Sequence, residues 1–66
     1  MIFPERLKQL RQKKGLIQQE IAELLGVKRN TYSDWENGKT EPNFEMVLKL
    51  ADLFEVSLDW LFGRDK

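Results

Sequence analysis

Residues 18–38 read QQEIAELLGVKRNTYSDWENG, and two short helical patterns meet at a glycine within this segment. The first pattern places Ile21, Leu24 and Leu25 at the spacing of an apolar helix face. Gly26 follows directly, and glycine is the residue that most readily adopts the positive φ found at helix C-termini. The first half of the segment is therefore predicted to be a helix that ends in a tight turn.

The second pattern restarts as a helix in which only Tyr32 and Trp35 are apolar. At about 100° per residue, its opposite side carries amide, hydroxyl, carboxylate and guanidinium groups. These groups belong to Arg29, Asn30, Ser33, Asp34 and Asn37. Any surface helix has polar residues opposite its apolar stripe, but the tight turn favours a helix-turn-helix over residues 18–37. Such an outward face can read base edges in DNA.

The length and composition restrict the possible functions. The 66 residues predict one domain, residues 1–66. The chain contains no Cys and no His, so it lacks the usual nucleophile, acid–base group and metal ligands. We therefore expect no enzymatic activity, no metal, no cofactor and no small-molecule ligand. Because no apolar run approaches the roughly 18 residues of a membrane span, we also expect a cytoplasmic protein without membrane association.

Three further helical patterns flank the central pair. The first is predicted to begin at Pro4, a suitable first-turn residue, and to end at Gly15. The fourth has Asn43 as its predicted N-cap, and Ser57 is the predicted N-cap of the fifth. The residues expected to face the core are Leu7, Leu10, Val47, Leu50, Ala51, Phe54, Leu58 and Leu61. The fold class is thus all-α, a compact five-helix bundle.

Residues 16–63 resemble the Cro/cI-type (XRE-like) helix-turn-helix domain of phage repressors and bacterial regulators. The matching features are Gln18, the Gly26-Val27 turn, the segment 36–39, Pro42 and the segment 56–59. The resemblance implies a lambda-repressor-like domain that binds double-stranded DNA operators, represses transcription and acts as a homodimer. Its third helix would enter the major groove, with half-sites about one helical turn apart.

The resemblance also assigns roles to individual residues. The positions that match base-reading residues are Arg29, Asn30, Ser33 and Asp34. Those that match or adjoin phosphate-contacting residues are Gln18, Lys28, Asn37, Lys39 and Thr40.

Elementary chemistry supports several of these roles. Arg29 can donate two hydrogen bonds to guanine, and Asn30 can pair twice with adenine, although either side chain could instead contact a phosphate. Asp34 could accept a hydrogen bond from cytosine N4 or pair with a neighbouring cation, Arg29 or Lys28. Gln18 could bind a phosphate or be a solvated surface residue.

The formal net charge of zero is unusual for a DNA-binding domain and predicts weak non-specific affinity. Basic residues nevertheless gather in or before the helix-turn-helix, which predicts one basic face. These are Arg11, Lys13, Lys14, Lys28, Arg29 and Lys39, whereas Asp52, Glu55, Asp59 and Asp65 follow it. The alternative function is a protein-interaction module of the same fold, such as an antirepressor or an antitoxin component.

Two tertiary contacts are also predicted. Arg11 and Glu36 each lie at the edge of an apolar stripe, where an unpaired charge is costly, so we expect an ion pair between their helices. The family resemblance points to the same pair. Trp60 and Phe62 lie off the inward face of the last helix and are expected to form a homodimer interface. Alternatively, Trp60 packs on the first or fourth helix as a partly exposed core residue.

Lys28→Ser tests the start of the second helix of the pair. Ile17 and Lys28 stand where the family usually has Ser or Thr, so both helices of the pair lack a side-chain cap. In Lys28→Ser, the new hydroxyl should accept a hydrogen bond from a helix N–H. The substitution also removes a cation from the positive end of the helix. We expect the folded state to gain about 0.5–2 kcal/mol in thermal melts, while DNA affinity falls or stays level. No gain in melting temperature would contradict the capping argument.

Overall fold

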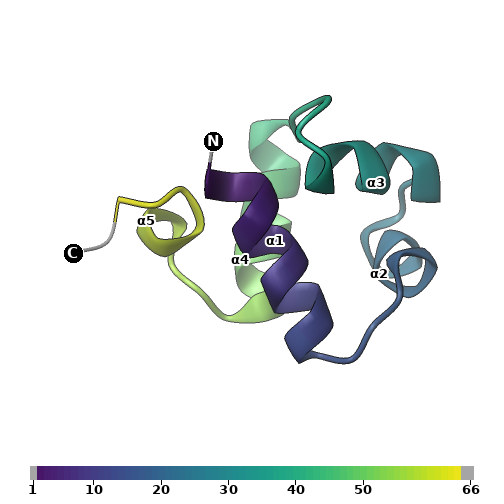
Figure 1. Cartoon of the computed structure of the whole chain (residues 1–66), viewed down its shortest axis with the longest axis horizontal. Helices are drawn as coiled ribbons and strands as arrows, with labels where there is room; N and C mark the ends of the chain where they lie inside the picture. Colours follow the sequence, from purple (N-terminus) through teal and green to yellow (C-terminus); the bar gives the residue numbers. More distant parts are fainter. Residues whose placement is uncertain (1, 65–66) are drawn as a thin grey trace.

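Five α-helices follow one another along the chain in the computed structural model, which describes residues 2–64 (Figure 1). They are α1 (Ile2–Lys13), α2 (Gln18–Leu25), α3 (Arg29–Glu36), α4 (Phe44–Phe54) and α5 (Leu58–Leu61). That range contains no strand, so the all-α fold with five helices is confirmed. Asp65 lies outside the described residues.

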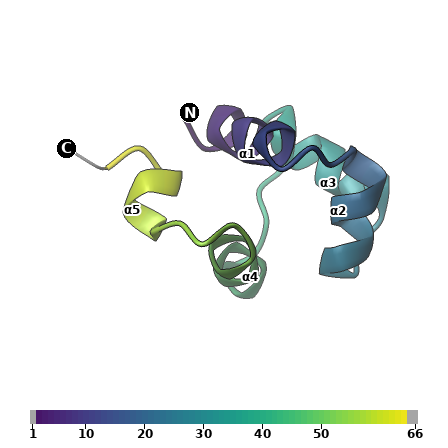
Figure 2. The ribbon, with the colours of Figure 1, turned by 90° about the horizontal axis from the view of Figure 1, so that it is seen from below.

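The helices close a ring around one core. The main packing pairs are α1 on α3, α3 on α2, α2 on α4, α4 on α5 and α5 on α1. Figures 1 and 2 show α2 and α3 at one end of the molecule and α5 at the other, with α1 and α4 at different levels between them. The buried side chains of the core are Phe3, Leu7, Ile21, Ala22, Leu25, Tyr32, Trp35, Val47, Leu50, Phe54 and Leu61. Because each helix has two main neighbours, the position of α3 depends on the whole ring.

The predicted caps of α4 and α5 are present. The Asn43 side chain accepts a hydrogen bond from the Met46 N–H at 2.9 Å, and the Ser57 hydroxyl accepts one from the Trp60 N–H at 3.1 Å. Gly26 ends α2 with a φ of 75°, as the sequence predicts. These local signals are strong because each needs only residues within one helical turn.

The helices of the central pair begin without side-chain caps. Ile17 and Lys28 occupy the N-cap positions in extended conformations, and neither side chain accepts a hydrogen bond. At α2 the Glu20 carboxylate compensates in part, because it accepts a hydrogen bond from the Ile17 N–H at 2.9 Å. The first turn of α3 contains no acidic residue. Of the two helices, α3 therefore has the less stabilised start.

The first helix starts earlier than the sequence predicts. It begins at Ile2 rather than Pro4. Pro4 is tolerated as the third residue because N–H groups in the first helical turn have no intrahelical partner to lose. The extension places Phe3 in the core.

Two leucines expected on inward faces are exposed. The core face of α2 consists of Ile21, Ala22 and Leu25, and Leu24 lies about 110° from its centre at 100° per residue. Its exposed fraction is 62%. Leu58 is also exposed, because the short helix α5 buries only Leu61.

Glu55→Gly tests the end of α4. Glu55 has a φ of 57°, the one positive φ outside glycine among the described residues. Glycine adopts this conformation without steric cost, and removal of a negative charge from the helix C-terminus is favourable. We expect Glu55→Gly to stabilise the fold by about 0.5–1 kcal/mol in urea titrations, after the larger entropy of unfolded glycine is subtracted.

Two control variants isolate the cause. Glu55→Gln removes the charge alone, and its gain should be smaller than that of glycine. Asp52→Gly also removes a negative charge but places glycine inside the same helix, where its propensity is lower, so it should not reproduce the gain of Glu55→Gly. A loss of stability in Glu55→Gly would contradict the conformational argument.

Candidate nucleic-acid interface

The helix-turn-helix consists of α2, a short turn and α3. The turn is held by hydrogen bonds from the Gly26 N–H to the Glu23 carbonyl oxygen at 3.2 Å and from the Val27 N–H to the Ala22 carbonyl oxygen at 3.0 Å. These bonds satisfy carbonyl groups at the end of α2 and fix the direction in which the chain enters α3. In Figure 1, α3 lies along the edge of the molecule, above α2.

One side of α3 is anchored in the core. Tyr32 and Trp35 are buried, and their rings meet edge to face with centroids 5.9 Å apart. This geometry is favourable because the positive edge of one ring faces the negative face of the other. The anchoring leaves the opposite side of α3 for contacts outside the chain.

Only part of the predicted base-reading set is fully exposed. Arg29 and Asn30 at the start of α3 are exposed, whereas Ser33 and Asp34 are half-buried. The Asn37 side-chain amide also donates a hydrogen bond to the Ser33 hydroxyl at 3.4 Å. The structure thus brings together a predicted base reader and a predicted phosphate contact one turn apart.

The turn after α3 carries three of the predicted phosphate contacts. The Asp34 carbonyl oxygen accepts hydrogen bonds from the N–H groups of Lys39 and Thr40, at 2.9 and 3.5 Å. These bonds fold the chain back onto α3, so that Asn37, Lys39 and Thr40 lie exposed beside its C-terminal end. Lys28 is exposed at the other end of α3. The predicted phosphate contacts therefore occur at both ends of the helix.

The ion pair expected between Arg11 and Glu36 is present. Arg11 Nε is 2.6 Å from Glu36 Oε2, and Arg11 Nη2 is 3.2 Å from Oε1, so both groups pair through two contacts. The exposed side-chain fraction is 13% for Arg11 and 2% for Glu36. Arg11 Nη1 also donates to the Leu16 carbonyl oxygen at 2.8 Å, just before α2. One guanidinium thus connects α1 with α3 and with the linker to α2.

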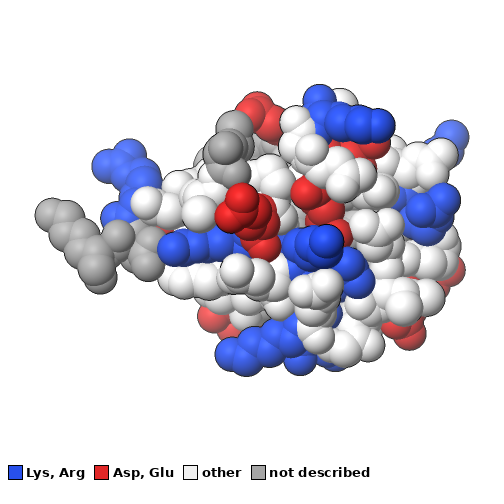
Figure 3. Space-filling view, in the orientation of Figure 1, with Lys and Arg blue, Asp and Glu red and all other residues white. Residues whose placement is uncertain are grey.

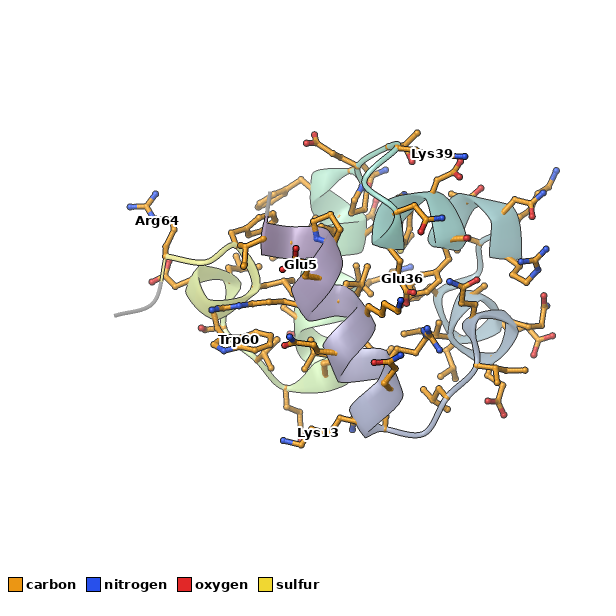
Figure 4. The ribbon with its side chains drawn as sticks, viewed as in Figure 1. Glu5, Lys13, Glu36, Lys39, Trp60 and Arg64 are labelled. Atoms are coloured by element: carbon orange, nitrogen blue, oxygen red, sulfur yellow. The ribbon has the colours of Figure 1, made fainter. Side chains whose placement is uncertain are left out.

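Two more side chains donate to the Glu36 carboxylate. The Tyr32 hydroxyl lies 2.6 Å from Oε2, and Gln18 Nε2 lies 3.0 Å from Oε1. Figure 4 shows Glu36 between α3 and α1. The sequence predicts only the Arg11 contact, and for Gln18 it leaves a phosphate ligand or a solvated surface residue as the two interpretations. No local sequence signal indicates that Gln18 binds a carboxylate.

The network fixes the protonation states of its members. Burial opposes the charge of Glu36, but the hydrogen bonds from Arg11, Tyr32 and Gln18 outweigh it and lower its pKa. Burial and the hydrogen bond to Glu36 raise the pKa of Tyr32. The hydrogen bond to Glu36 outweighs desolvation and raises the pKa of Arg11. At neutral pH the network therefore holds a carboxylate, a guanidinium and a protonated phenol.

The predicted basic face does not appear on the side of the described residues that Figure 3 shows. Acidic side chains lie among the basic ones on that side, which includes α1 and α3. A hollow of about 320 Å³ between the start of α1 and the turn after α3 is lined in part by Glu5, Glu36 and Glu41, beside Asn37 and Thr40. Glu36 and Glu41 adjoin two predicted phosphate contacts in the sequence, and folding adds Glu5 from α1.

The aromatic residues of α5 and its end have partners within the chain. The Arg6 guanidinium lies 4.5 Å from the Trp60 ring centroid, and Arg6 Nη1 also donates to the Trp60 carbonyl oxygen. Phe62 stacks on Phe3 with ring centroids 5.1 Å apart, although 40% of Phe62 remains exposed. Trp60 is a half-buried residue packed against the core and the side chain of Arg6 from α1, which is the second of the two expected arrangements. Both rings are thus partly covered within the chain, and the dimer interface stays a prediction.

One exposed aromatic residue was missed. Phe44 is the first residue of α4, and 73% of its side chain is exposed. It directly follows the N-cap Asn43, where the chain leaves the turn after α3. At 100° per residue Phe44 lies about 70° from the centre of the buried face of α4, so periodicity alone does not identify it as an outward residue.

Neither a membrane-spanning helix nor a metal-binding group occurs among the described residues. None of the helices within 2–64 is long and apolar enough to cross a membrane. The same residues contain no group of three or more side chains that could hold a metal ion.

The comparison with known proteins identifies the family. A family model described as helix-turn-helix matches residues 7–61, which include α2 and α3. The chain belongs to the helix-turn-helix family, in its Cro/cI-type (XRE-like) branch. Its relatives are transcriptional regulators, which are not enzymes.

Three similar proteins illustrate the relationship. The transcriptional regulator AnsR of Bacillus subtilis is 44% identical over 62 residues, which cover 94% of this chain and 53% of AnsR. The cryptic phage CTXphi transcriptional repressor RstR of Vibrio cholerae is 34% identical over 64 residues, covering 97% of this chain and 57% of RstR. The crystal structure of a transcriptional regulator from Listeria innocua matches with a TM-score of 0.89 and 38% identity, covering 97% of this chain and 60% of that one. The helix-turn-helix chain thus spans little more than half the length of these relatives.

Removing one partner of the ion pair should cost more than removing both. Arg11→Met leaves the buried Glu36 carboxylate without its cation, and we expect a loss of about 3 kcal/mol in urea titrations at pH 7. The double variant Arg11→Met/Glu36→Leu should recover part of that loss, because no charge is left uncompensated. Lys13→Met, which removes an exposed charge from α1, is the control and should change stability little. Equal losses in the single and double variants would contradict the pairing.

Proposed function

We propose that this helix-turn-helix chain is a sequence-specific, double-stranded DNA-binding transcription regulator, and more narrowly a cytoplasmic repressor. The observation that carries the proposal is the exposure of Arg29 and Asn30 at the start of α3, the second helix of the pair. In domains of this type that helix enters the major groove through its N-terminal residues. The names of the relatives support transcription regulation in general, and the name of RstR supports repression.

Base recognition is assigned to the outward face of α3. Arg29 can donate to guanine O6 and N7, and Asn30 can pair with adenine N6 and N7. Ser33 and Asp34 complete the proposed base-reading set, with Asp34 as an acceptor for cytosine N4. Their partial burial gives them a smaller reach than the two exposed residues, so we assign most of the discrimination to Arg29 and Asn30.

Phosphate contacts are assigned to both ends of α3 and to the start of α2. Lys28 precedes α3, whereas Asn37, Lys39 and Thr40 follow it. Gln18 begins α2, where a side-chain amide and backbone N–H groups are available to an anion. Contacts at both ends would fix the rotation and depth of α3 in the groove, which is the role of backbone contacts in DNA recognition.

A homodimer is the proposed assembly on DNA. A two-fold dimer doubles the number of contacts and places two copies of α3 one helical turn apart. We keep the C-terminal segment with Trp60 and Phe62 as its proposed interface, where the exposed parts of Phe62 and Leu58 provide apolar surface. Both rings also pack on partners within the chain, Arg6 and Phe3, which is evidence against this interface.

The alternative is a protein-interaction module of the same fold. Its specific support is electrostatic, since the chain has zero net charge and carboxylates line the hollow beside Asn37 and Thr40. Such a surface attracts DNA weakly at long range. Specific base contacts, rather than overall charge, would then have to supply most of the affinity for an operator.

Selection of bound duplexes from a random-sequence pool tests the DNA function directly. We expect an enriched site with two half-sites about one helical turn apart. Arg29→Ala and Asn30→Ala should each relax the preference at one position per half-site and cost about 1–3 kcal/mol on the best site. Lys39→Ala should weaken all sequences alike and reduce the salt dependence of binding.

A different experimental result would contradict each part of the proposal. Absence of any enriched sequence would favour the protein-interaction module. A uniform loss from all three variants would remove Arg29 and Asn30 from base reading and leave DNA shape as the source of specificity. An enriched single half-site, with a monomer in sedimentation of the complex, would exclude the dimer. An unchanged dimer in Trp60→Ala would move the interface away from α5.

A further inference from the structure

We propose that Glu36 is a positioning residue for DNA binding, which holds the side-chain amide of Gln18 in the orientation that contacts a phosphate. The inference rests on the proposed function and deepens it. It connects a phosphate contact at the start of α2 to a buried carboxylate at the end of α3. Neither residue needs to move when DNA arrives.

The hydrogen bond between the two residues determines which way the amide faces. Gln18 Nε2 lies 3.0 Å from Glu36 Oε1. An ionised carboxylate can only accept hydrogen bonds, so the amide nitrogen, rather than its oxygen, must face Glu36. An amide nitrogen carries two N–H groups, and the bond to Glu36 uses one of them. The second is available to an acceptor outside the chain, such as a phosphate oxygen.

Glu36 is itself held in place from several directions. Arg11 donates to both of its oxygens, and the buried Tyr32 hydroxyl donates to Oε2 at 2.6 Å. Arg11 also fixes the Leu16 carbonyl oxygen, two residues before Gln18. The backbone leading into Gln18 and the partner of its side chain are thus fixed by the same guanidinium.

This arrangement reduces the cost of binding. A free glutamine side chain on a surface loses rotamer freedom when it contacts a ligand, and this loss opposes binding. Gln18 is half-buried and already bonded within the chain, so much of that ordering occurs on folding. The other proposed phosphate contacts differ, because Lys28, Asn37, Lys39 and Thr40 are all exposed.

The arrangement also couples two parts of the proposed interface. Glu36 and Tyr32 belong to α3, whereas Gln18 belongs to α2. A shift of α3 relative to α2 would therefore move or break the support of Gln18. While this support is intact, the phosphate contact and the base-reading helix keep one relative position. Reading DNA in a fixed register requires such a fixed position.

A double-mutant cycle in DNA affinity tests the positioning role. Tyr32→Phe removes the hydroxyl that holds Glu36 but keeps the buried ring and leaves the residues of the proposed interface unchanged. Affinity for the selected duplex is measured for the wild type, Tyr32→Phe, Gln18→Ala and the double variant. Lys39→Ala provides the matched background, because Lys39 is also a proposed phosphate contact but is not among the three donors to Glu36 described above. Urea titrations of every variant set conditions under which each is folded.

We expect Tyr32→Phe to weaken binding about 3- to 10-fold in the wild type, as for the loss of one hydrogen bond. The same substitution should have almost no effect in the Gln18→Ala background and its full effect in the Lys39→Ala background. Equal losses in all three backgrounds would assign Tyr32 and Glu36 a purely structural role and overturn the inference. No loss in the wild type would also overturn it. A wild type that selects no duplex would instead overturn the proposed function.

A second measurement needs no variant. In the nuclear magnetic resonance spectrum of the wild type, we expect one side-chain N–H proton of Gln18 to exchange slowly with water while its partner exchanges fast. Addition of the selected duplex should shift the fast proton and leave the slow one protected. Rapid exchange of both protons in the free protein would mean that Glu36 does not hold the amide, and the inference would fail even if Tyr32→Phe does not fold.

Discussion

The Glu36 carboxylate is the group on which the arrangement of the first three helices depends. A buried carboxylate is costly unless its oxygens are paired and hydrogen-bonded. Here the donors come from α1, α2 and α3, through Arg11, Gln18 and Tyr32. All four residues must therefore converge for the charge to be tolerated, and convergence requires the three helices in one relative position. Apolar packing alone is less demanding, because hydrophobic contacts have no fixed direction.

The far side of the ring is held by different means. The α5 end is fixed on α1 by the stack of Phe62 on Phe3 and by the Arg6 contact with Trp60. Gly63 follows with a φ of 74°, and a Cβ there would collide with Ile2. The Ile2 side chain at the start of α1 thus lies directly against the Gly63 backbone. A domain of this size buries only about 60% of the surface its unfolded chain exposes, so this closure contributes substantially to a limited core.

The electrostatics of the chain have consequences for its proposed role. Its net charge is zero, and carboxylates lie close to the proposed phosphate contacts. Such a protein gains little from long-range attraction to DNA, and its residence on non-specific sites should be short. Directional contacts from a pre-ordered interface then carry more of the discrimination. The fixed network behind α3 and the exposed Arg29 and Asn30 in front of it suit that requirement.

The sequence by itself determined the number of helices, the glycine turn at Gly26, the caps at Asn43 and Ser57 and the edge positions of Arg11 and Glu36. These features depend on periodicity and on interactions within one helical turn, which a single sequence contains. Only the tertiary structure decided that Gln18 donates to Glu36, that the α5 tryptophan packs against Arg6, and that Glu5 joins Glu36 and Glu41 beside the turn after α3. The first contact joins two residues that are 18 positions apart in the chain, and the second joins two that are 54 positions apart. Their existence depends on how the ring of helices closes, and no local pattern records that closure.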